Sequence, residues 1–449
     1  MCEIIVIDSC RILKLFIIMK CLLRLLVLLS ILFHYSQLQA DQGLLNRLND
    51  DHARGVSHWI YNDLSKAQEE AKRLNQPIFV TFRCVPCHAC KSVDAEVAKG
   101  NDKIMKMATE KFVSLRQVEM KGVDLSQFQF DYDLNWAAMF INADGTVYGR
   151  YGTQSADGPD AYNSVDSLLK AMERVLVYPN NKGYLTAKKG APKPYKTAID
   201  LPGLPNKRKY RQQTERSNCI HCHNIHDALC NDDYAKGKVT REYHWRYPLP
   251  ENVGLKINKD DGQLVQEVET GSAAAMAGLK AGDRIVAINN QAIISIADMQ
   301  WVFHNLSNQG ANIQVSAIRN GAIESFNLIT QKDWKKTNFS WRGSMWNMKP
   351  KMGIWMPFAE ERDLKRMGLT AGHKAMQVKW INHNVPTAQA AQRVGLRTGD
   401  FIIAIEGKPI TMDHRELNYH IKLKYKPGDT LPMTLWRKGQ KIDFNCPLK

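Results

Sequence analysis

Short apolar runs alternate with polar, helix-like stretches along the first half of the chain. Short runs typical of strands lie at 78–82, 112–115, 137–141 and 146–151. Apolar residues at helical spacing predict helices over 64–74 and 165–177. The turn signal Asn142-Ala143-Asp144-Gly145 joins the last two strands into a hairpin. This order of elements predicts a small α/β domain.

Two cysteines stand where the first of these strands passes into a second helix. Cys84-Val85-Pro86-Cys87 follows the 78–82 strand directly. The arrangement resembles the thioredoxin-like family, and the resemblance implies that Cys84 is the attacking thiolate and Cys87 its resolving partner. In that family a proline usually precedes the hairpin strand, but Leu134-Asn135-Trp136-Ala137-Ala138 contains none. Redox-active thiols, a metal site and an inert disulfide therefore all stay open for this pair.

Apolar periodicity is absent between about 181 and 247, where prolines and basic residues predict an extended, solvated linker. Much of the net charge of +16 at pH 7 comes from residues 182–216. The chain has no nucleic-acid reading motif, so we expect no nucleic-acid partner. A basic linker of this kind is consistent with contact to an anionic membrane surface or an acidic partner, and also with simple solvation.

The linker ends in Cys219-Ile220-His221-Cys222-His223. This C-x-x-C-H spacing resembles the attachment motif of c-type cytochromes, which implies that Cys219 and Cys222 bond covalently to haem c and that His223 is the iron ligand. Two other readings stay open. One is a disulfide between the two thiols. The other is a zinc site made of Cys219, Cys222, His226 and Cys230.

The second half contains an internal repeat. Ala277-Gly278-Leu279-Lys280-Ala281-Gly282-Asp283 returns as Val394-Gly395-Leu396-Arg397-Thr398-Gly399-Asp400. Each copy follows an alanine-rich helix and precedes an amphipathic helix and a hairpin. Both copies closely resemble the PDZ domain, in the form found on bacterial HtrA-type proteases. No Gly-x-Ser-x-Gly or trypsin-like serine segment accompanies them, so we expect a binding half without a protease.

The PDZ resemblance implies two grooves that bind a peptide or a protein C-terminus beside an apolar-Gly-apolar loop. Each groove is expected to lie against the amphipathic helix of its repeat. The alternative is that one or both grooves are occluded and serve only as rigid spacers. The loop residues are Val253, Gly254 and Leu255 in the first copy and Met352, Gly353 and Ile354 in the second. The helix residues expected to face the grooves are Gln300 and Phe303, and Leu417 and Ile421.

The N-terminus carries a basic stretch, an apolar run and a small residue, Ala40, before Asp41. This order is typical of a signal peptide and predicts an exported protein, periplasmic or extracellular, with Met19 as an alternative start. If the segment is not cleaved, it anchors the chain in the membrane.

We therefore expect a multidomain chain of α/β plus mainly-β class, in which a thioredoxin-like domain precedes two PDZ domains, each a partly open β-barrel with two helices. The expected regions are a signal peptide (1–40), the thioredoxin-like domain (41–180), the basic linker with the haem motif (181–247) and the PDZ domains (248–333 and 345–449). The leading functional prediction is thiol-redox or electron transfer with covalent haem c, with thiol–disulfide oxidoreductase-like activity and a redox partner protein docked by the PDZ domains. The alternative is a non-enzymatic scaffold or chaperone-like adaptor with disulfide-fixed or zinc-bound cysteines.

Overall fold

The computed structural model describes residues 58–83, 96–97, 101–177, 195–211, 218–238, 241–339, 341–344, 349–369 and 372–449. The expected signal peptide and the Cys84–Cys87 pair lie outside these residues. Within them, no helix has the length and apolar character needed to cross a membrane.

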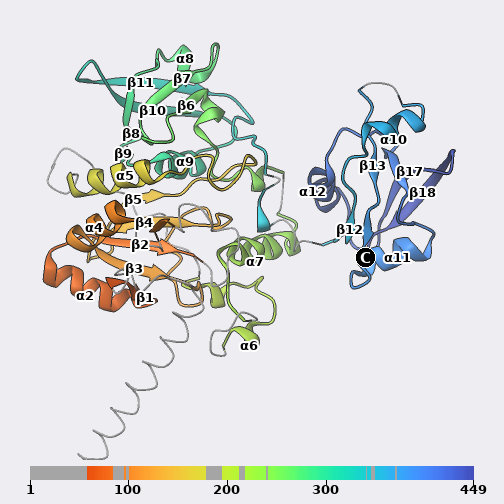
Figure 1. Ribbon diagram of the computed structural model, residues 1–449, viewed down its shortest axis with the longest axis horizontal. Helices are drawn as coiled ribbons and strands as arrows, with labels where there is room; N and C mark the ends of the chain where they lie inside the picture. Colours follow the sequence, from red (N-terminus) through yellow and green to blue (C-terminus); the bar gives the residue numbers. More distant parts are fainter. Residues whose placement is uncertain are drawn as a thin grey trace, which may run out of the picture. The chain divides into compact units, whose positions relative to one another are not determined.

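The N-terminal domain is built on a five-stranded sheet of order β1-β3-β2-β4-β5 (Figure 1). The strands β1, β3 and β2 run parallel, β4 is antiparallel to β2, and β5 is antiparallel to β4. The strands are β1 (Ile60–Tyr61), β2 (Ile78–Phe82), β3 (Val113–Gln117), β4 (Ala137–Ile141) and β5 (Val147–Tyr151). The helices are α2 (Leu64–Leu74), α4 (Asp102–Lys111) and α5 (Val165–Val177). Every residue of β2 is buried, as its unbroken apolar run predicts.

The expected solvated linker is wrong over the part that the structure describes. A 3₁₀ turn (Ala198–Asp200), a short helix α6 (Lys207–Tyr210) and the longer helix α7 (Cys222–Ala235) follow one another there. Leu201, Leu204 and Ile225 are buried in the core of the N-terminal domain. Scattered apolar residues without periodicity are enough to hold this segment, because it packs on an existing core and builds none of its own.

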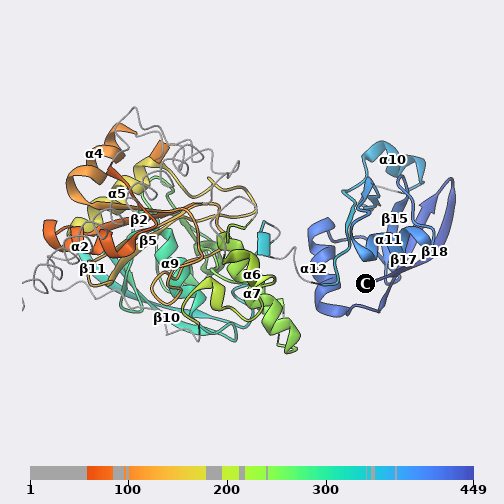
Figure 2. The same ribbon diagram turned by 90° about the horizontal axis from the view of Figure 1, so that it is seen from below.

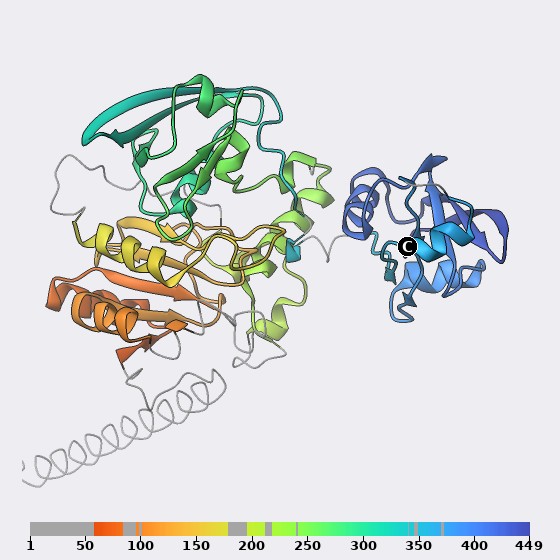
Figure 3. The ribbon, with the colours of Figure 1, turned by 45° about the horizontal axis from the view of Figure 1, so that its top comes forward.

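The middle domain has its own core and the order of elements that the repeat predicts. Its strands are β6 (Leu255–Ile257), β7 (Val265–Val268), β8 (Arg284–Ile288), β9 (Gln291–Ala292), β10 (Ala311–Arg319) and β11 (Ala322–Thr330). Its helices are η6 (Pro250–Val253), α8 (Ala273–Met276) and α9 (Ile296–His304). The β10–β11 hairpin is visible as two long teal arrows in Figure 3.

The C-terminal domain (Figure 2) has a third core and repeats this order, with the helix α10 and the strand β13 added after its first strand. Its strands are β12 (Ile354–Trp355), β13 (Met376–Gln377), β14 (Trp380–Ile381), β15 (Phe401–Ile405), β16 (Lys408–Pro409), β17 (Thr430–Arg437) and β18 (Gln440–Pro447). Its helices are α10 (Glu361–Arg366), α11 (Pro386–Arg393) and α12 (His414–Lys424).

The two copies of the repeat have the same ion pair, formed by a buried aspartate and a partly exposed arginine. Arg319 donates to both carboxylate oxygens of Asp283 and to the carbonyl of Gly278. Arg437 makes the same three bonds to Asp400 and Gly395. The arginine of the hairpin therefore fixes the glycine-aspartate turn in both copies, which confirms that the repeat in the sequence is a repeat in structure.

Candidate functional site

The Cys-x-x-Cys-His motif lies at the start of α7. Cys222 is the first helical residue, and the backbone N–H of His221 donates to Asn224 Oδ1 at 3.0 Å. Cys219 and Cys222 are each only 6% exposed, and Cys222 packs in the core of the N-terminal domain. The His223 side chain, by contrast, keeps 40% of its surface exposed. The motif thus places its thiols inside the protein and its last imidazole at the surface.

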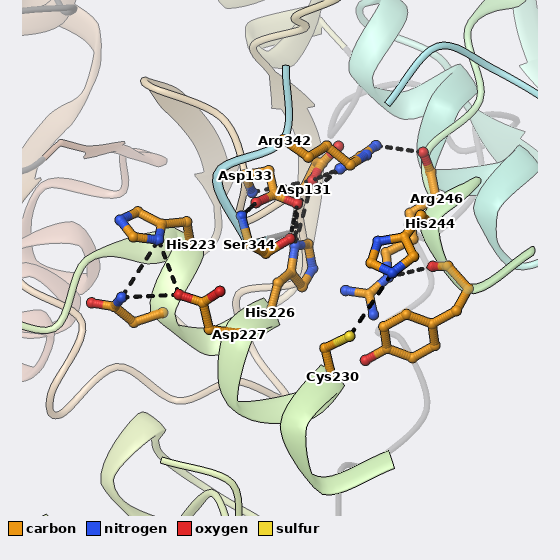
Figure 4. Close-up of polar contacts among 12 residues, drawn as sticks. Asp131, Asp133, His223, His226, Asp227, Cys230, His244, Arg246, Arg342 and Ser344 are labelled. Carbon is orange, nitrogen blue, oxygen red and sulfur yellow. Dashed lines mark hydrogen bonds and ion pairs between the residues drawn. The ribbon is translucent and has the colours of Figure 1, made fainter. Parts of the chain in front are cut away.

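A carboxylate holds the imidazole of His223 in place. Its Nδ1 lies 3.3 Å from Asp227 Oδ2, one helical turn further along α7 (Figure 4). Burial opposes the charged form of the ring, but the Asp227 carboxylate outweighs it and raises the pKa of His223. A carboxylate on one ring nitrogen fixes the orientation of the other, which is a common arrangement beside a metal-ligating histidine.

The alternative zinc set is not assembled. Among the described residues, Asp131, Asp133 and His226 alone form a group of three or more His, Cys, Asp or Glu with ligand atoms within 4.8 Å of one another. Within this part of the chain, no three residues of the predicted zinc set come this close together. His226 Nδ1 lies 3.0 Å from Asp133 Oδ2. Cys230 Sγ lies 3.9 Å from His244 Nε2, and burial raises the pKa of Cys230 to about 12. His226 and Cys230 therefore lie one helical turn apart on α7 but contact different partners.

Asp131, Asp133 and His226 belong to a buried polar cluster that the sequence did not indicate (Figure 4). Arg342 Nη1 lies 2.8 Å from Asp131 Oδ1 and 3.1 Å from Asp133 Oδ2. Ser344 donates its N–H and its hydroxyl to Asp133 at 2.8 and 2.9 Å. Burial opposes ionisation of Asp133, but His226 and Arg342 outweigh it and lower its pKa. A guanidinium thus already forms ion pairs with both carboxylates that would otherwise suit a metal ion.

This cluster joins three segments that are far apart in the sequence. The aspartates precede β4, His226 is in α7, and Arg342 and Ser344 follow the middle domain. Arg342 also donates to the carbonyl of Arg246 at 2.6 Å. The cluster therefore fixes the chain that leaves the middle domain onto the N-terminal domain and α7.

The groove of the middle domain is closed by the N-terminal domain. Counted from the N-cap Ser295, the first, fifth and ninth residues of α9 are Ile296, Gln300 and His304. Thr153 of the N-terminal domain donates to Gln300 Oε1 at 2.8 Å, and Gln300 donates to the carbonyl of Tyr247 at 2.7 Å. The Tyr247 ring stacks on His304 with centroids 4.2 Å apart. This face of α9 is thus occupied by the chain itself.

Further contacts close the loop end of the same groove. Tyr162 of the N-terminal domain packs against the middle core and donates its hydroxyl to Glu251 Oε1 at 3.1 Å. The predicted loop residues Val253 and Leu255 are fully buried in that core, and a side chain at Gly254 would overlap Ser272. Of the predicted helix residues, Gln300 faces the groove, whereas Phe303 is in the core.

The groove of the C-terminal domain is open. It forms a cavity of about 390 Å³ between the loop around Gly353 and one face of α12. The predicted loop residues Met352, Gly353 and Ile354 all line it. From α12 the lining residues are the first, fifth and ninth after the N-cap Asp413, namely His414, Asn418 and Lys422.

The predicted helix residues Leu417 and Ile421 are wrong as groove residues. Both have no exposed surface and belong to the core of the C-terminal domain. They are apolar because they face inward, and the polar residues next to them face the groove. The polar residues of α12 that line the groove could have been predicted by aligning α9 and α12 at their N-caps, Ser295 and Asp413.

Two family models match this chain. A thioredoxin-like model matches residues 59–143, and a PDZ domain model matches residues 253–330. The N-terminal domain is therefore thioredoxin-like and the middle domain is a PDZ domain, as expected. The models do not extend to the C-terminal domain or to the Cys219–His223 motif.

The curated relatives are bacterial proteases. A probable periplasmic serine protease do/HhoA-like of Haemophilus influenzae is 32% identical over 36% of this chain and 31% of its own length. A probable periplasmic serine endoprotease DegP-like of Pseudomonas savastanoi is 28% identical over 41% of this chain and 38% of its own length. This chain thus spans about a third of the length of these relatives.

Among solved structures, the HtrA3 PDZ domain bound to a phage-derived ligand is 21% identical, covers 22% of this chain and 83% of that chain, and has a TM-score of 0.17. The serine endoprotease from Yersinia pestis is 31% identical over 16% of this chain and 25% of that chain, with a TM-score of 0.14.

Proposed function

We propose that this chain is an exported adaptor that binds protein C-termini in the groove of residues 349–449, which act as a second PDZ domain. The observation that carries the proposal is the open cavity of about 390 Å³ beside Gly353, at the place where the repeat puts the peptide site. The middle domain has the same architecture, but the N-terminal domain covers its groove. The two repeats therefore have different roles: the middle domain docks on the N-terminal domain, and the C-terminal domain binds a partner.

The edge of β12 suits the addition of a peptide strand. Among the described strands β12 pairs with β14 alone, and the backbone N–H groups of Lys379 and Asn382 donate to the carbonyls of Trp355 and Gly353. The other edge of β12 faces the cavity toward α12. An extended peptide placed there gains backbone hydrogen bonds along β12, and its carboxylate lies at the N–H groups around Gly353.

A comparison of free and blocked peptides tests this binding. We expect fluorescence anisotropy on the full chain to show binding of a labelled decapeptide with a free C-terminal carboxylate, and at least about tenfold weaker binding of its C-terminal amide. Asn418→Phe fills the groove from α12 and should abolish binding. Arg362→Phe places the same ring on a side chain that is 72% exposed on α10 and serves as control. Equal binding of acid and amide, or no effect of Asn418→Phe, contradicts the proposal.

We further propose that Cys84 and Cys87 exchange electrons with the bound partner. The match of residues 59–143 to a thioredoxin-like model supports this role, since it includes both cysteines. In the reaction a disulfide of the partner takes two electrons and two protons from the two thiols, which form a disulfide. Alkylation and intact mass across a series of glutathione potentials should show a two-electron couple in the chain, and Cys84→Ser should remove it. A chain without such a couple supports the scaffold function.

The Cys219, Cys222 and His223 motif is proposed as a covalent haem c site. The support is the Asp227 carboxylate on Nδ1 of His223, which directs the other ring nitrogen away from Asp227 as an iron ligand requires. A bound haem would supply one-electron transfer. Protein made with haem-attachment machinery should gain the mass of one haem and give a pyridine haemochrome, and Cys222→Ala should lose both. A Cys219–Cys222 disulfide or bound zinc in that preparation contradicts haem.

Export to the periplasm completes the proposal. The signal-peptide pattern of residues 1–40 supports it, and the first two curated relatives are described as periplasmic. The basic residues between 182 and 216 would hold the exported chain near an anionic membrane surface.

A further inference from the structure

The open groove of the C-terminal domain contains charge of one sign. Its charged lining residues are Lys351 and Lys422, and the lining includes no aspartate or glutamate. The closed groove of the middle domain has Ile296, Gln300 and His304 on the matching face of its helix, and none of these is a lysine. The positive charge is thus a property of this groove and is not shared by the repeat.

The two lysines lie at the same end of the groove. Lys351 directly precedes the loop residues Met352 and Gly353. Lys422 is only 1% exposed, and burial, with the nearby charge of Lys351, lowers the pKa of Lys422 to about 7. An anionic group of a ligand placed at this end of the groove is attracted by both lysines. The backbone N–H groups around Gly353 can bind the terminal carboxylate of a peptide. The two lysines can then attract a second negative charge on the same peptide.

The other end of the groove is aromatic. Trp355 and Trp380 lie opposite each other in the β12–β14 pair and are 47% and 55% exposed. His414, at the first turn of α12, places its ring 4.7 Å from the Trp355 ring. Since Lys422 is at the last turn of the same helix, the charged and aromatic ends are separated along the groove.

A peptide that adds antiparallel to β12 has its last residue at Gly353 and its earlier residues near Trp355. In an extended strand the last residue and the one two positions before it share a face. We propose that this groove selects C-termini that end in aspartate or glutamate and carry an aromatic residue two positions before the end. This specificity rests on the proposed binding of C-termini and adds the class of ligand.

Four labelled peptides on the full chain separate the two proposals. They share seven residues and end in Trp-Gly-Glu, Trp-Gly-Gln, Ala-Gly-Glu and Trp-Gly-Glu amide. We expect the Glu peptide to bind about tenfold tighter than the Gln peptide, and the Trp peptide several-fold tighter than the Ala peptide. If no peptide with a free carboxylate binds, the proposed function fails. If the Gln peptide binds as tightly as the Glu peptide, only the specificity is overturned.

Variants of the two lysines assign the effect. Lys422→Gln and Lys351→Gln should each reduce the preference for Glu over Gln to about twofold or less while binding of the Gln peptide persists. Lys351 is half-buried, so it keeps the test valid if Lys422→Gln does not fold. Lys365→Gln removes the same charge from α10, where the side chain is 74% exposed, and should leave the preference unchanged. A preference that survives both groove variants overturns the assignment to these lysines.

Discussion

Arg342 is important for stability because its guanidinium is 1% exposed and forms ion pairs with two buried aspartates. Removing one partner from a buried ion pair leaves uncompensated charge, which typically costs about 3–5 kcal/mol. We expect Arg342→Met to lower the free energy of unfolding by this amount in urea titrations. Arg362→Met, whose arginine is exposed, should cost less than about 0.5 kcal/mol. A loss below about 1 kcal/mol for Arg342→Met would mean that the cluster does not hold these segments together.

Glu406 gives the C-terminal domain a defined acid sensitivity. Burial opposes its ionisation, but bonds from Lys424, Tyr425 and His420 outweigh it and lower the pKa of Glu406 to about 2. Its ordinary value is 4.5, so the carboxylate stabilises the fold fully above about pH 5, and this contribution is lost as the pH falls toward 2. Because the side chain is partly exposed, we expect about 1–2 kcal/mol.

Glu406→Gln should therefore flatten the pH dependence of unfolding of the C-terminal domain between pH 5 and 2. Thermal unfolding followed by tryptophan fluorescence measures it. Glu361→Gln, which alters an 82% exposed carboxylate on α10, is the matched control. If Glu406→Gln keeps the acid slope of the native protein, another carboxylate is responsible.

At the scale of elements, side chains in and just before α9 pack directly against the backbone of β5. Gly149 lies in β5, and a side chain there would overlap the buried Ile294. Next to it, the N–H of Arg150 donates to Asp298 Oδ1 at 3.0 Å. A glycine in a strand often marks a place where another part of the chain comes near, as it does here.

Gly149→Ala should therefore loosen the middle domain from the N-terminal domain. We expect faster hydrogen exchange in α9 and β5 and a loss of about 1–3 kcal/mol in stability. Gly122→Ala is the matched control, since no atom lies within 4 Å of the added carbon. Unchanged exchange in α9 would show that the overlap is absorbed by movement of Ile294.

The positions of the helices and strands were largely predictable from the sequence, but which face of a helix lines a groove was not. The predicted helices over 165–177 and 64–74 match α5 and α2, because their apolar spacing has one strong period. In α12 the groove was predicted at Leu417 and Ile421 because they are apolar, but these residues belong to the core. Hydrophobic periodicity identifies the buried side of a helix, whereas a binding groove is lined by the residues beside it.

At the scale of the molecule, contacts between distant segments could not be predicted from the sequence. In the buried cluster, Asp133 and Arg342 resemble ordinary surface charges in the sequence, and His226 was predicted, as an alternative, to bind zinc with other partners. The closure of the middle groove likewise depends on Thr153 and Tyr162, which no local pattern marks. Such contacts form only between parts of the chain that have already folded, so hydrophobic periodicity and local motifs do not predict them.

These contacts predict how the whole chain unfolds. The N-terminal and middle domains share buried ion pairs, among them Arg150 with Asp298 and Arg174 with Asp261. The C-terminal domain has a core of its own. We expect hydrogen exchange in increasing urea to give one unfolding free energy for β2 and α9 and a different one for β17, because shared buried contacts make two domains open together. Asp298→Ala should split the first transition and leave β17 unchanged. If α9 exchanges well before β2 in the native protein, the middle domain is not fixed to its neighbour, and its groove is open to ligands as well.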